Sequence, residues 1–338
     1  MRAVILVGGM GTRLRPLTYE TPKQLLPVVG VPLIERSLAN LERHGVTEAV
    51  LALGYLPEQF VAAYPEGRIA GVAVSYSVED EPLDTAGAIG FAARQAGIDD
   101  TFVVVNGDVV TDLDLSALIA FHRERGAVAT IALHPVEDPS RYGVVTIDDD
   151  GRVSSFIEKP RGIAPTNLIN AGVYVMEPGV LARIAPSGRV SVEREVFPAL
   201  VAAGELYARA DHGYWLDTGT PATYLQANVD ILAGKDGPVV GAGHGSWQHP
   251  GSQVHPTATL VHAVVDANCV VGPGARLEQS VLLPGAIIEE GAVVCSSIVG
   301  PGAVIGAYAQ LGPTCVVGAH ERVAPGSWLI GDVRLGGV

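Results

Sequence analysis

A glycine-rich stretch with three cations lies near the start of the sequence. Residues 6–28 are LVGGMGTRLRPLTYETPKQLLPV, and they include Arg13, Arg15 and Lys23. The backbone N–H groups of such a turn can reach anionic oxygens, and nearby Lys and Arg side chains add positive charge. The spacing fits neither a Walker loop nor a dinucleotide fingerprint, in which Leu14 would have to be glycine. A cradle for a triphosphate and a basic surface turn are the two interpretations that remain.

Two aspartates further along could hold a divalent cation. Asp108 ends the apolar run TFVVVNGD, 101–108, and Asp217 lies in YWLDTGTP, 214–221. An Asp at the carboxyl end of a parallel strand lies where ligands bind, and its oxygens suit Mg²⁺. Either Asp could instead shape a turn or cap a helix. The residues alone leave both interpretations open.

The stretch FIEKP, 156–160, places Glu158 and Lys159 at an expected strand end. Adjacent opposite charges before a proline are a common pattern of exposed ion pairs. On the residues alone, a solvated pair is the favoured interpretation.

The elements that would position these residues alternate between apolar runs and amphipathic stretches. Nearly continuous apolar runs are typical of strands buried on both faces of a parallel sheet. Alternation with helices predicts an open α/β sheet, with ligands at the carboxyl ends of its strands. The expected strands are 3–9, 49–55, 72–77 and 101–108, and the expected helices are 32–45, 84–97 and 114–126.

A six-residue period begins after a Gly-, Pro- and Ser-containing linker at 234–252. Aliphatic residues recurring at a fixed short period, with glycine at constant phase, predict a β-solenoid of four or five coils. An irregular Gly- and Val-rich β domain is the alternative. The periodic positions, with a phase break after the fourth, are Val265, Val271, Leu277, Leu283, Val299, Ile305, Leu311, Val317 and Val323.

Composition limits the classes of protein to consider. The 338-residue chain carries a net charge of −14, which disfavours nucleic-acid binding. No apolar stretch approaches the ~20 residues of a membrane span, and the N-terminal apolar run is too short for a signal peptide. The three cysteines show no C-x-x-C spacing, so neither a disulfide framework nor a zinc site is indicated. We expect a soluble cytoplasmic protein.

The stretches GGMGTRLRPLT and TPKQLLPV together resemble the N-terminal motif of the sugar-nucleotide pyrophosphorylases, or sugar-1-phosphate nucleotidylyltransferases. The resemblance implies transfer of a nucleotidyl group from an NTP to a sugar 1-phosphate, with release of pyrophosphate. It also implies a Rossmann-like, GT-A-like open mixed sheet with helices on both faces. The six-residue period that follows resembles the hexapeptide repeat of left-handed parallel β-helices, so we expect that fold after the sheet. The expected domains are 1–233 for catalysis, 234–252 as linker and 253–338 as β-helix.

The resemblance also implies roles for the first group of residues. Arg13 and the glycine turn would bind the NTP phosphates, and Lys23 would lie by the reacting α-phosphate. Asp108 and Asp217 would hold Mg²⁺, and Arg13, Lys23 and Asp108 are the expected catalytic residues. The expected nucleotide-binding residues are Leu6, Gly8, Gly9, Gly11, Thr12, Arg13, Lys23, Pro82, Gly87 and Asp108.

For the sugar phosphate, the resemblance extends to FIEKP, NAGVY (170–174) and RYGVV (141–145). Glu158 would accept hydrogen bonds from sugar hydroxyls, and Lys159 would bind the phosphate. Asn170 would be a second hydroxyl partner, and Gly143 a backbone contact. The expected substrate-binding residues are Asp84, Gly143, Glu158, Lys159, Asn170 and Asp217.

Asp84 departs from the family pattern. The segment EDEPLDTAGAI, 79–89, matches E-x-P-L-G-T-A-G except that Asp84 stands where glycine is usual. Glycine there would suit a close approach or a positive φ, and Asp tolerates the left-handed region better than most residues. Asp84 either caps the following helix or contacts substrate, for example a donor edge such as that of guanine.

Within the family, SRYGVV and SVEREVFPAL (191–200) resemble the mannose-1-phosphate guanylyltransferase branch. GTP and mannose 1-phosphate, giving GDP-mannose, are the expected substrates. Alternatives are dTTP, UTP or ATP with glucose 1-phosphate, a non-catalytic regulatory homologue, and a second acyltransferase activity in the β-helix. We expect a homo-oligomer with no nucleic-acid or membrane partner, and a β-helix that serves oligomerisation or regulation.

Overall fold

The structure is a computed structural model, and it describes residues 1–235, 242–243 and 245–337. It forms two compact units, and each is described by itself. Unit 1 comprises Met1–Gly9 and Ile34–Trp215, and unit 2 comprises Met10–Leu33 and Leu216–Val338. Part of the expected linker, residues 236–241 and 244, lies outside the described residues.

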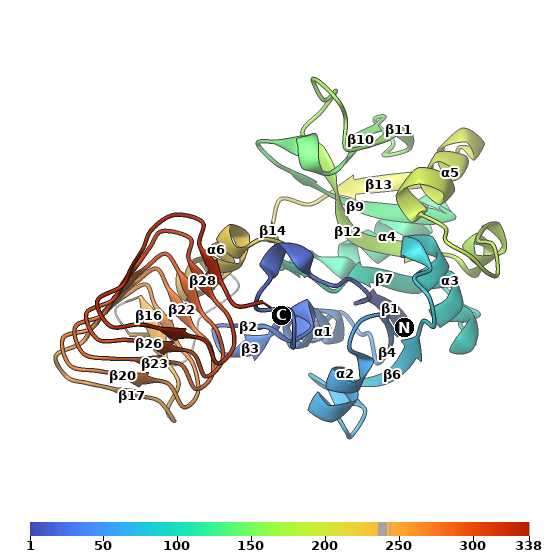
Figure 1. Ribbon diagram of the computed structural model, residues 1–338. Coiled ribbons are helices and arrows are strands. Elements are labelled where there is room, and N and C mark those ends of the chain that lie inside the picture. The colour runs from blue at the N-terminus through green and yellow to red at the C-terminus, as the bar shows by residue number, and fades with distance from the viewer. Residues whose placement is uncertain (236–241, 244, 338) are drawn as a thin grey trace. The chain divides into compact units, whose positions relative to one another are not determined.

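Unit 1 is built on a ten-stranded mixed sheet whose main path runs β11-β10-β12-β7-β1-β4-β6-β5 (Figure 1). Its centre is parallel, because β1 pairs in parallel with β4 and β7, and β4 pairs in parallel with β6. All four apolar runs that were expected to be strands contain a strand in the structure. Their bounds are β1 Arg2–Leu6, β4 Glu48–Leu53, β6 Val72–Val78 and β7 Phe102–Asn106.

Both faces of the central strands are buried. Val4 packs in the cluster formed with helix α3 (Asp84–Gln95), while Ala3 and Ile5, on the opposite face, are also fully buried. This explains why the strands are continuously apolar and not alternating. The expected helices are confirmed as α1 Leu33–Arg43, α3 and α4 Leu115–Arg125; the others are α2 Pro57–Ala63, α5 Phe197–Ala203 and α6 Pro221–Leu232.

On one side of β7 the sheet becomes antiparallel, and it ends there in the hairpin of β10 and β11. Strand β12 (Leu168–Met176) runs antiparallel to β7, with Val173 opposite Val105. Because of this direction, the first residues of β12 extend beyond the carboxyl end of β7. Strands β10 (Gly143–Ile147) and β11 (Val153–Glu158) continue from there, with Val144 opposite Ile169. The remaining strands of the sheet are β5 Arg68–Ile69, β9 Ala129–Pro135 and β13 Leu206–Ala210.

In unit 2, residues from 246 onward form the expected left-handed parallel β-helix, seen as nested orange-to-red turns in Figure 1. One of its three sheets stacks five strands, which gives five coils. Those strands are β17 Gln253–Val254, β20 Val270–Val271, β23 Ile287–Ile288, β26 Val304–Ile305 and β29 Arg322–Val323. The prediction of four or five coils is confirmed.

The phase break in the repeat has a structural cause. Val265 is in register with Leu282, and Leu282 with Val299, so each of these coils advances by 17 residues and not 18. One side of the coil is therefore a residue shorter than a strict six-residue period requires. Leu283, which the period assigned to the core register, is buried but lies one residue past it. The other eight periodic positions are buried as predicted.

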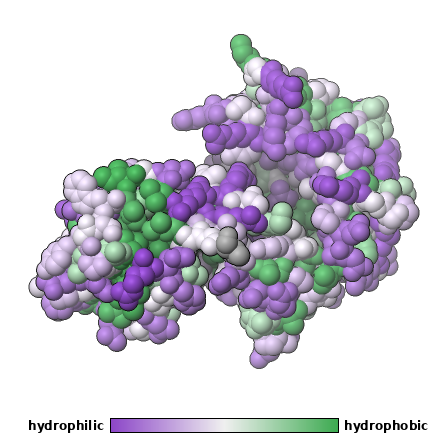
Figure 2. All heavy atoms as spheres, in the orientation of Figure 1, coloured by the Kyte–Doolittle hydropathy of each residue, from purple (hydrophilic) through white to green (hydrophobic). Residues whose placement is uncertain are grey.

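The coils also carry apolar side chains on their outside, and Figure 2 shows hydrophobic side chains gathered on the β-helix surface. On β23, Ile287 is 37% exposed while its neighbour Ile288 is fully buried. Successive residues of a strand point to opposite faces, so β23 places one residue inside the coils and one outside. On another sheet of the β-helix both residues of such strands are buried, as for Val264 and Val265 on β19 (Val264–Val265). Among the described residues, no helix has the length and apolar character needed to span a bilayer.

The adjacent pair on β23 gives a matched test of the core. We expect Ile288→Ala to lower the free energy of unfolding by about 2–5 kcal/mol, because it leaves a cavity inside the coils. Ile287→Ala should cost well under half as much, since its side chain is partly solvated. Urea unfolding followed by circular dichroism measures both. Equal losses for the two variants would contradict the inward and outward assignment.

Candidate functional site

In unit 2, the glycine turn continues into a short 3₁₀ helix, η1 (Thr12–Leu14). Gly11 has a φ of 59°, and a Cβ at this position would lie 3.0 Å from Thr18 Cγ2. Leu14 N and Thr18 Oγ1 each donate a hydrogen bond of 2.9 Å to the Gly11 carbonyl. The turn therefore depends on the absence of a side chain at Gly11, as the left-handed backbone requires.

Three residues predicted to act together are neighbours in this unit. Lys23 begins a second short helix, η2 (Lys23–Leu25), and its Nζ lies 3.5 Å from Asp217 Oδ1. A Cβ at Gly219 would lie 2.5 Å from Arg13 Nη2 and 2.8 Å from Asp217 Oδ1. The guanidinium of Arg13 thus occupies the space beside Asp217 that a side chain at Gly219 would fill. Two cations and one carboxylate converge here.

Asp217 carries an oxygen suited to a metal. Its Oδ1 is buried and accepts no hydrogen bond within the described residues, although Lys23 balances its charge. Buried polar atoms are almost always hydrogen-bonded, so such an oxygen calls for an explanation. A hard divalent cation takes oxygen ligands from one or two carboxylates and from substrate phosphates. The donor at Asp217 fits that chemistry.

In unit 1, the predicted nucleotide residues gather at the carboxyl ends of the parallel strands. Gly107 N donates to Leu6 O at 3.0 Å, and a Cβ at Gly107 would lie 2.7 Å from Val7 Cγ1. This close crossing places Asp108 directly beyond the ends of β1 and β7. Asp108 is half-buried.

Gly8 and Gly9 extend β1 past the sheet and are exposed. A Cβ at Gly54, just after β4, would lie 3.2 Å from Gly8 O. The patterns in the sequence did not single out Gly54, although its place after an apolar run matched that of Gly8. Two bare backbone segments therefore meet at this edge.

The hairpin β10–β11 brings Gly143 and Glu158 together as a register pair. A Cβ at Gly143 would lie 2.6 Å from Phe156 Cζ and 3.1 Å from Glu158 Oε2. Glycine thus leaves room for the carboxylate to lie over the strand. Lys159 Nζ is 3.4 Å from Glu158 Oε1, with 61% of its side chain exposed. The expected ion pair is present, and its ammonium faces solvent, where an anion can reach it.

Asn170 holds a bulge at the start of β12. Its Nδ2 donates to Tyr174 Oη at 2.9 Å, and its Oδ1 accepts from Gly172 N at 2.9 Å. Gly172 has a φ of 77°, and a Cβ there would lie 2.7 Å from Asn106 Nδ2. Asn106, which was not assigned a role from the sequence, therefore lies beside the bulge. The contact of Asn170 with a sugar stays a prediction.

Aromatic rings flank the same bulge. Trp215 Nε1 donates to Ala171 O at 2.9 Å, and its ring stacks on His134 with centroids 5.5 Å apart. Tyr142 meets the Trp215 ring edge-on at the same separation. Burial lowers the pKa of His134, which favours its neutral form. This cluster was not predicted as part of the site, because its members are far apart in the sequence.

Asp84 adopts the backbone that glycine would supply. Its φ is 60°, it is exposed, and its Oδ1 accepts a hydrogen bond of 3.0 Å from Thr85 N. The carboxylate thus bonds to the amide of the next residue, whereas Leu83 is the N-cap of α3 and, among the described residues, makes no side-chain cap hydrogen bond. The helix-cap interpretation is therefore not confirmed, and the contact of Asp84 with substrate stays a prediction. Glu79 closes the same loop, since its Oε2 accepts from Leu83 N at 3.0 Å. Burial raises the pKa of Glu79.

The remaining predicted residues of this loop differ in exposure. Pro82 is exposed. Gly87 is buried in α3, its amide donates to Val190 O at 3.1 Å, and a Cβ there would lie 2.8 Å from Leu83 Cβ. Close packing of the helix on the segment at Val190 thus accounts for glycine at 87.

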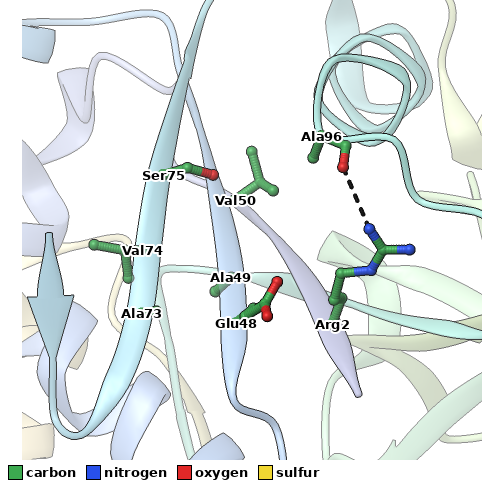
Figure 3. A pocket seen from close by; sticks show the side chains of 8 residues that line it. All are labelled: Arg2, Glu48, Ala49, Val50, Ala73, Val74, Ser75 and Ala96. Atoms are coloured by element: carbon green, nitrogen blue, oxygen red, sulfur yellow. Dashed lines mark hydrogen bonds between the residues drawn. The ribbon is translucent and has the colours of Figure 1, made fainter.

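A cavity of about 270 Å³ lies at the opposite end of the strands (Figure 3). Arg2, Glu48 and Ala73, at or near the beginnings of β1, β4 and β6, line it. The Arg2 guanidinium donates to Ala96 O at 3.3 Å across it. This cavity is at the amino ends of the strands, away from Asp108, and it brings together none of the predicted residues.

Comparisons with known proteins match two consecutive parts of the chain. The Nucleotidyl transferase family matches residues 2–234, and the GMPPB C-terminal domain matches residues 245–333. A mannose-1-phosphate guanylyltransferase of Mycobacterium tuberculosis is 41% identical over 285 residues, which cover 83% of this chain and 79% of that protein. A mannose-1-phosphate guanylyltransferase catalytic subunit beta of Drosophila pseudoobscura pseudoobscura is 38% identical over 281 residues, covering 82% and 72%.

Among solved structures, HddC from Yersinia pseudotuberculosis, complexed with GMP-PN, resembles part of this chain. The two share 30% sequence identity with a TM-score of 0.59. The match covers 68% of this chain and 99% of HddC. The match therefore includes nearly all of HddC but leaves about a third of this chain unmatched.

Gly219 gives a direct test of the cluster in unit 2. We expect Gly219→Ala to weaken nucleoside triphosphate binding about tenfold or more, because the methyl group displaces the Arg13 guanidinium. The guanidinium can swing away, so the unfolding midpoint should change little. Isothermal titration with GTP and thermal unfolding measure the two effects.

Gly179→Ala is the matched control, since no atom of the described residues lies within 4 Å of a Cβ there. If Gly219→Ala binds GTP as tightly as this control, Arg13 does not hold the triphosphate from its observed place.

Proposed function

We propose a function for this chain from the premise that it belongs to the Nucleotidyl transferase family. It joins a sugar 1-phosphate to a nucleoside triphosphate, releasing pyrophosphate and an NDP-sugar. The observation that carries this proposal is the convergence of Arg13, Lys23 and Asp217 in unit 2. Two cations and a buried carboxylate oxygen that accepts no hydrogen bond within the described residues suit a metal-bound triphosphate.

For the substrate pair we propose GTP and mannose 1-phosphate, with GDP-mannose as the product. The support is the identity of about 40% to proteins named mannose-1-phosphate guanylyltransferase, over more than four-fifths of this chain. A hydrogen-bonding base pocket rejects a wrong base strongly, because buried polar groups are then left unpaired. The nucleotide preference should therefore be clear.

In the proposed reaction, a phosphate oxygen of the sugar 1-phosphate attacks the α-phosphorus of the NTP. The bond from this phosphorus to the oxygen that bridges to the β-phosphate breaks, and pyrophosphate leaves in line. Arg13 neutralises the departing phosphates and Lys23 the charge that develops at the α-phosphate. Lys159 binds the incoming phosphate, while Glu158 and Asn170 orient the sugar. No protein nucleophile is needed.

Members of the family generally use a divalent metal, and we propose Mg²⁺ for this chain. Asp217 is a proposed ligand for its buried oxygen, and Asp108 for its place beyond the carboxyl end of β7. When bound, Mg²⁺ would neutralise phosphate charge and orient the triphosphate. The ion pair with Lys23 holds the Asp217 carboxylate in place.

A substrate panel tests the function itself. We expect pyrophosphate release to be fastest with GTP and mannose 1-phosphate, and at least about tenfold slower with dTTP, UTP or ATP. Chelation of divalent metal should abolish turnover. Preference for another pair would correct the substrate assignment, and inactivity with every pair would instead favour a non-catalytic homologue.

Lys23 tests the assigned chemistry. We expect Lys23→Gln to lower kcat by about 10²- to 10³-fold with a smaller change in KM, because the charge acts mainly in the transition state. Lys235→Gln, which removes another lysine in an ion pair with an aspartate, should leave kcat unchanged. Circular dichroism would verify that both variants fold, since Lys23 is buried. Near-normal turnover in a folded Lys23→Gln protein would refute the assignment.

A further inference from the structure

We propose that Arg334, on the last strand of the β-helix, is a positioning residue for the turn that carries Arg13. The inference rests on the proposed function, because it assigns the β-helix a part in holding the triphosphate-binding turn. It concerns unit 2 alone, in which both segments lie. Arg334 lies on β31 (Arg334–Leu335), and in Figure 1 the red end of the chain lies beside the dark-blue segment.

The contact is a pair of hydrogen bonds from one guanidinium nitrogen. Arg334 Nη1 donates to Arg13 O at 2.6 Å and to Arg15 O at 3.0 Å. The Nε of the same side chain lies 3.4 Å from Asp332 Oδ1. Asp332 thus orients the guanidinium from one side while the two carbonyls hold it from the other. An arginine presents such donors in a planar, permanently charged group.

With these two bonds, every backbone carbonyl of residues 11–15 accepts a hydrogen bond. The carbonyls of Gly11, Thr12 and Leu14 accept bonds from amides within the segment. The carbonyls of Arg13 and Arg15 accept from Arg334. A 3₁₀ turn of three residues has poor internal hydrogen-bond geometry, so it gains from an outside donor. The donor here acts on the backbone of Arg13 itself and so limits where its side chain can lie.

The strand that carries Arg334 is paired with the neighbouring coil of the β-helix. Strand β31 pairs in parallel with β28 (Val316–Val317), and Gly318 N donates to Leu335 O at 2.7 Å. The coil touches the turn at a second point, because a Cβ at Gly318 would lie 3.2 Å from Pro16 Cβ. The β-helix therefore meets the turn through a stacked coil and not through a loose tail. Rigid support of this kind is what positioned binding groups need.

The charge of Arg334 has a further consequence. It satisfies the carbonyls of a segment that already carries Arg13 and Arg15, and it keeps the surroundings positive. The partial negative charges of these two carbonyls are therefore already neutralised by the Arg334 guanidinium when an anionic ligand binds the turn. Loss of Arg334 should affect the NTP more than the sugar phosphate, because Glu158, Lys159 and Asn170, which are proposed to bind the sugar phosphate, lie in unit 1.

Kinetics of the full chain test the proposal. We expect Arg334→Ala to lower kcat/KM for the NTP about tenfold, the change that ~1.4 kcal/mol produces. The KM for the sugar 1-phosphate should change less than about twofold. Arg334→Lys should recover part of the loss, because an ammonium can reach a carbonyl but lacks the planar fork.

Arg322→Ala is the matched control, since Arg322 lies on the same β-helix and its Nη1 contacts Glu289, 3.4 Å away. It should leave both kinetic parameters unchanged. If Arg334→Ala behaves like Arg322→Ala in an active enzyme, the positioning role is wrong. If the wild-type chain turns over no substrate pair, the proposed function fails, and the following measurement still decides the positioning role.

Amide hydrogen exchange reports on the turn without any assay of activity. We expect the amides of residues 11–19 to exchange faster in Arg334→Ala than in Arg322→Ala, with equal unfolding midpoints for the two variants. Faster exchange confined to this segment would support the role of Arg334. Identical exchange in the two variants would overturn it.

Discussion

The pairing of Lys23 with Asp217 is the interaction on which the site in unit 2 depends. An ammonium that is almost fully buried needs a counter-charge, because an unpaired buried cation is strongly destabilising. Asp217 supplies that charge, and in doing so it fixes η2 against the segment that leads into α6. Gly219, which has no side chain, leaves the space beside Asp217 that the Arg13 guanidinium occupies. The proposed binding site and the packing of this part of unit 2 thus depend on the same residues.

The β-helix supports this arrangement from two sides within unit 2. At its first coil, Trp247 packs against Gly30, whose φ of 73° and missing side chain allow the contact. At its last coil, Arg334 bonds to the carbonyls of Arg13 and Arg15. Residues 10–33 are therefore flanked by coils that are far away in the sequence. The repeat domain is more than an appended module, since it contributes contacts to the segment that carries the expected phosphate ligands.

The sequence predicted the elements well where one periodicity dominated. The apolar runs became strands buried on both faces, and the six-residue repeat became stacked coils, because each pattern has only one economical way to bury its side chains. Leu283 shows the limit of this reasoning. A strict six-residue period assigned Leu283 to the core register that Leu282 occupies in the structure. The period could not show that one side of the coil is a residue shorter, because that depends on how neighbouring coils stack. At Asp84 the sequence was informative about the backbone. The family pattern has glycine at this position, glycine suits a positive φ, and Asp84 adopts one.

What the sequence by itself determined is the alternation of elements and the solenoid, and it also supplied the residues proposed to carry phosphate and metal chemistry. These follow from local spacing, since a glycine turn, a strand-end aspartate and a six-residue period are each contained in a short stretch. Only the tertiary structure decided which of these groups are partners. That Lys23 faces Asp217, that Gly219 admits Arg13, and that Arg334 binds the turn at Arg13 and Arg15 depend on how distant segments dock. No local pattern encodes such docking, because its free energy comes from contacts that exist only once both segments have folded.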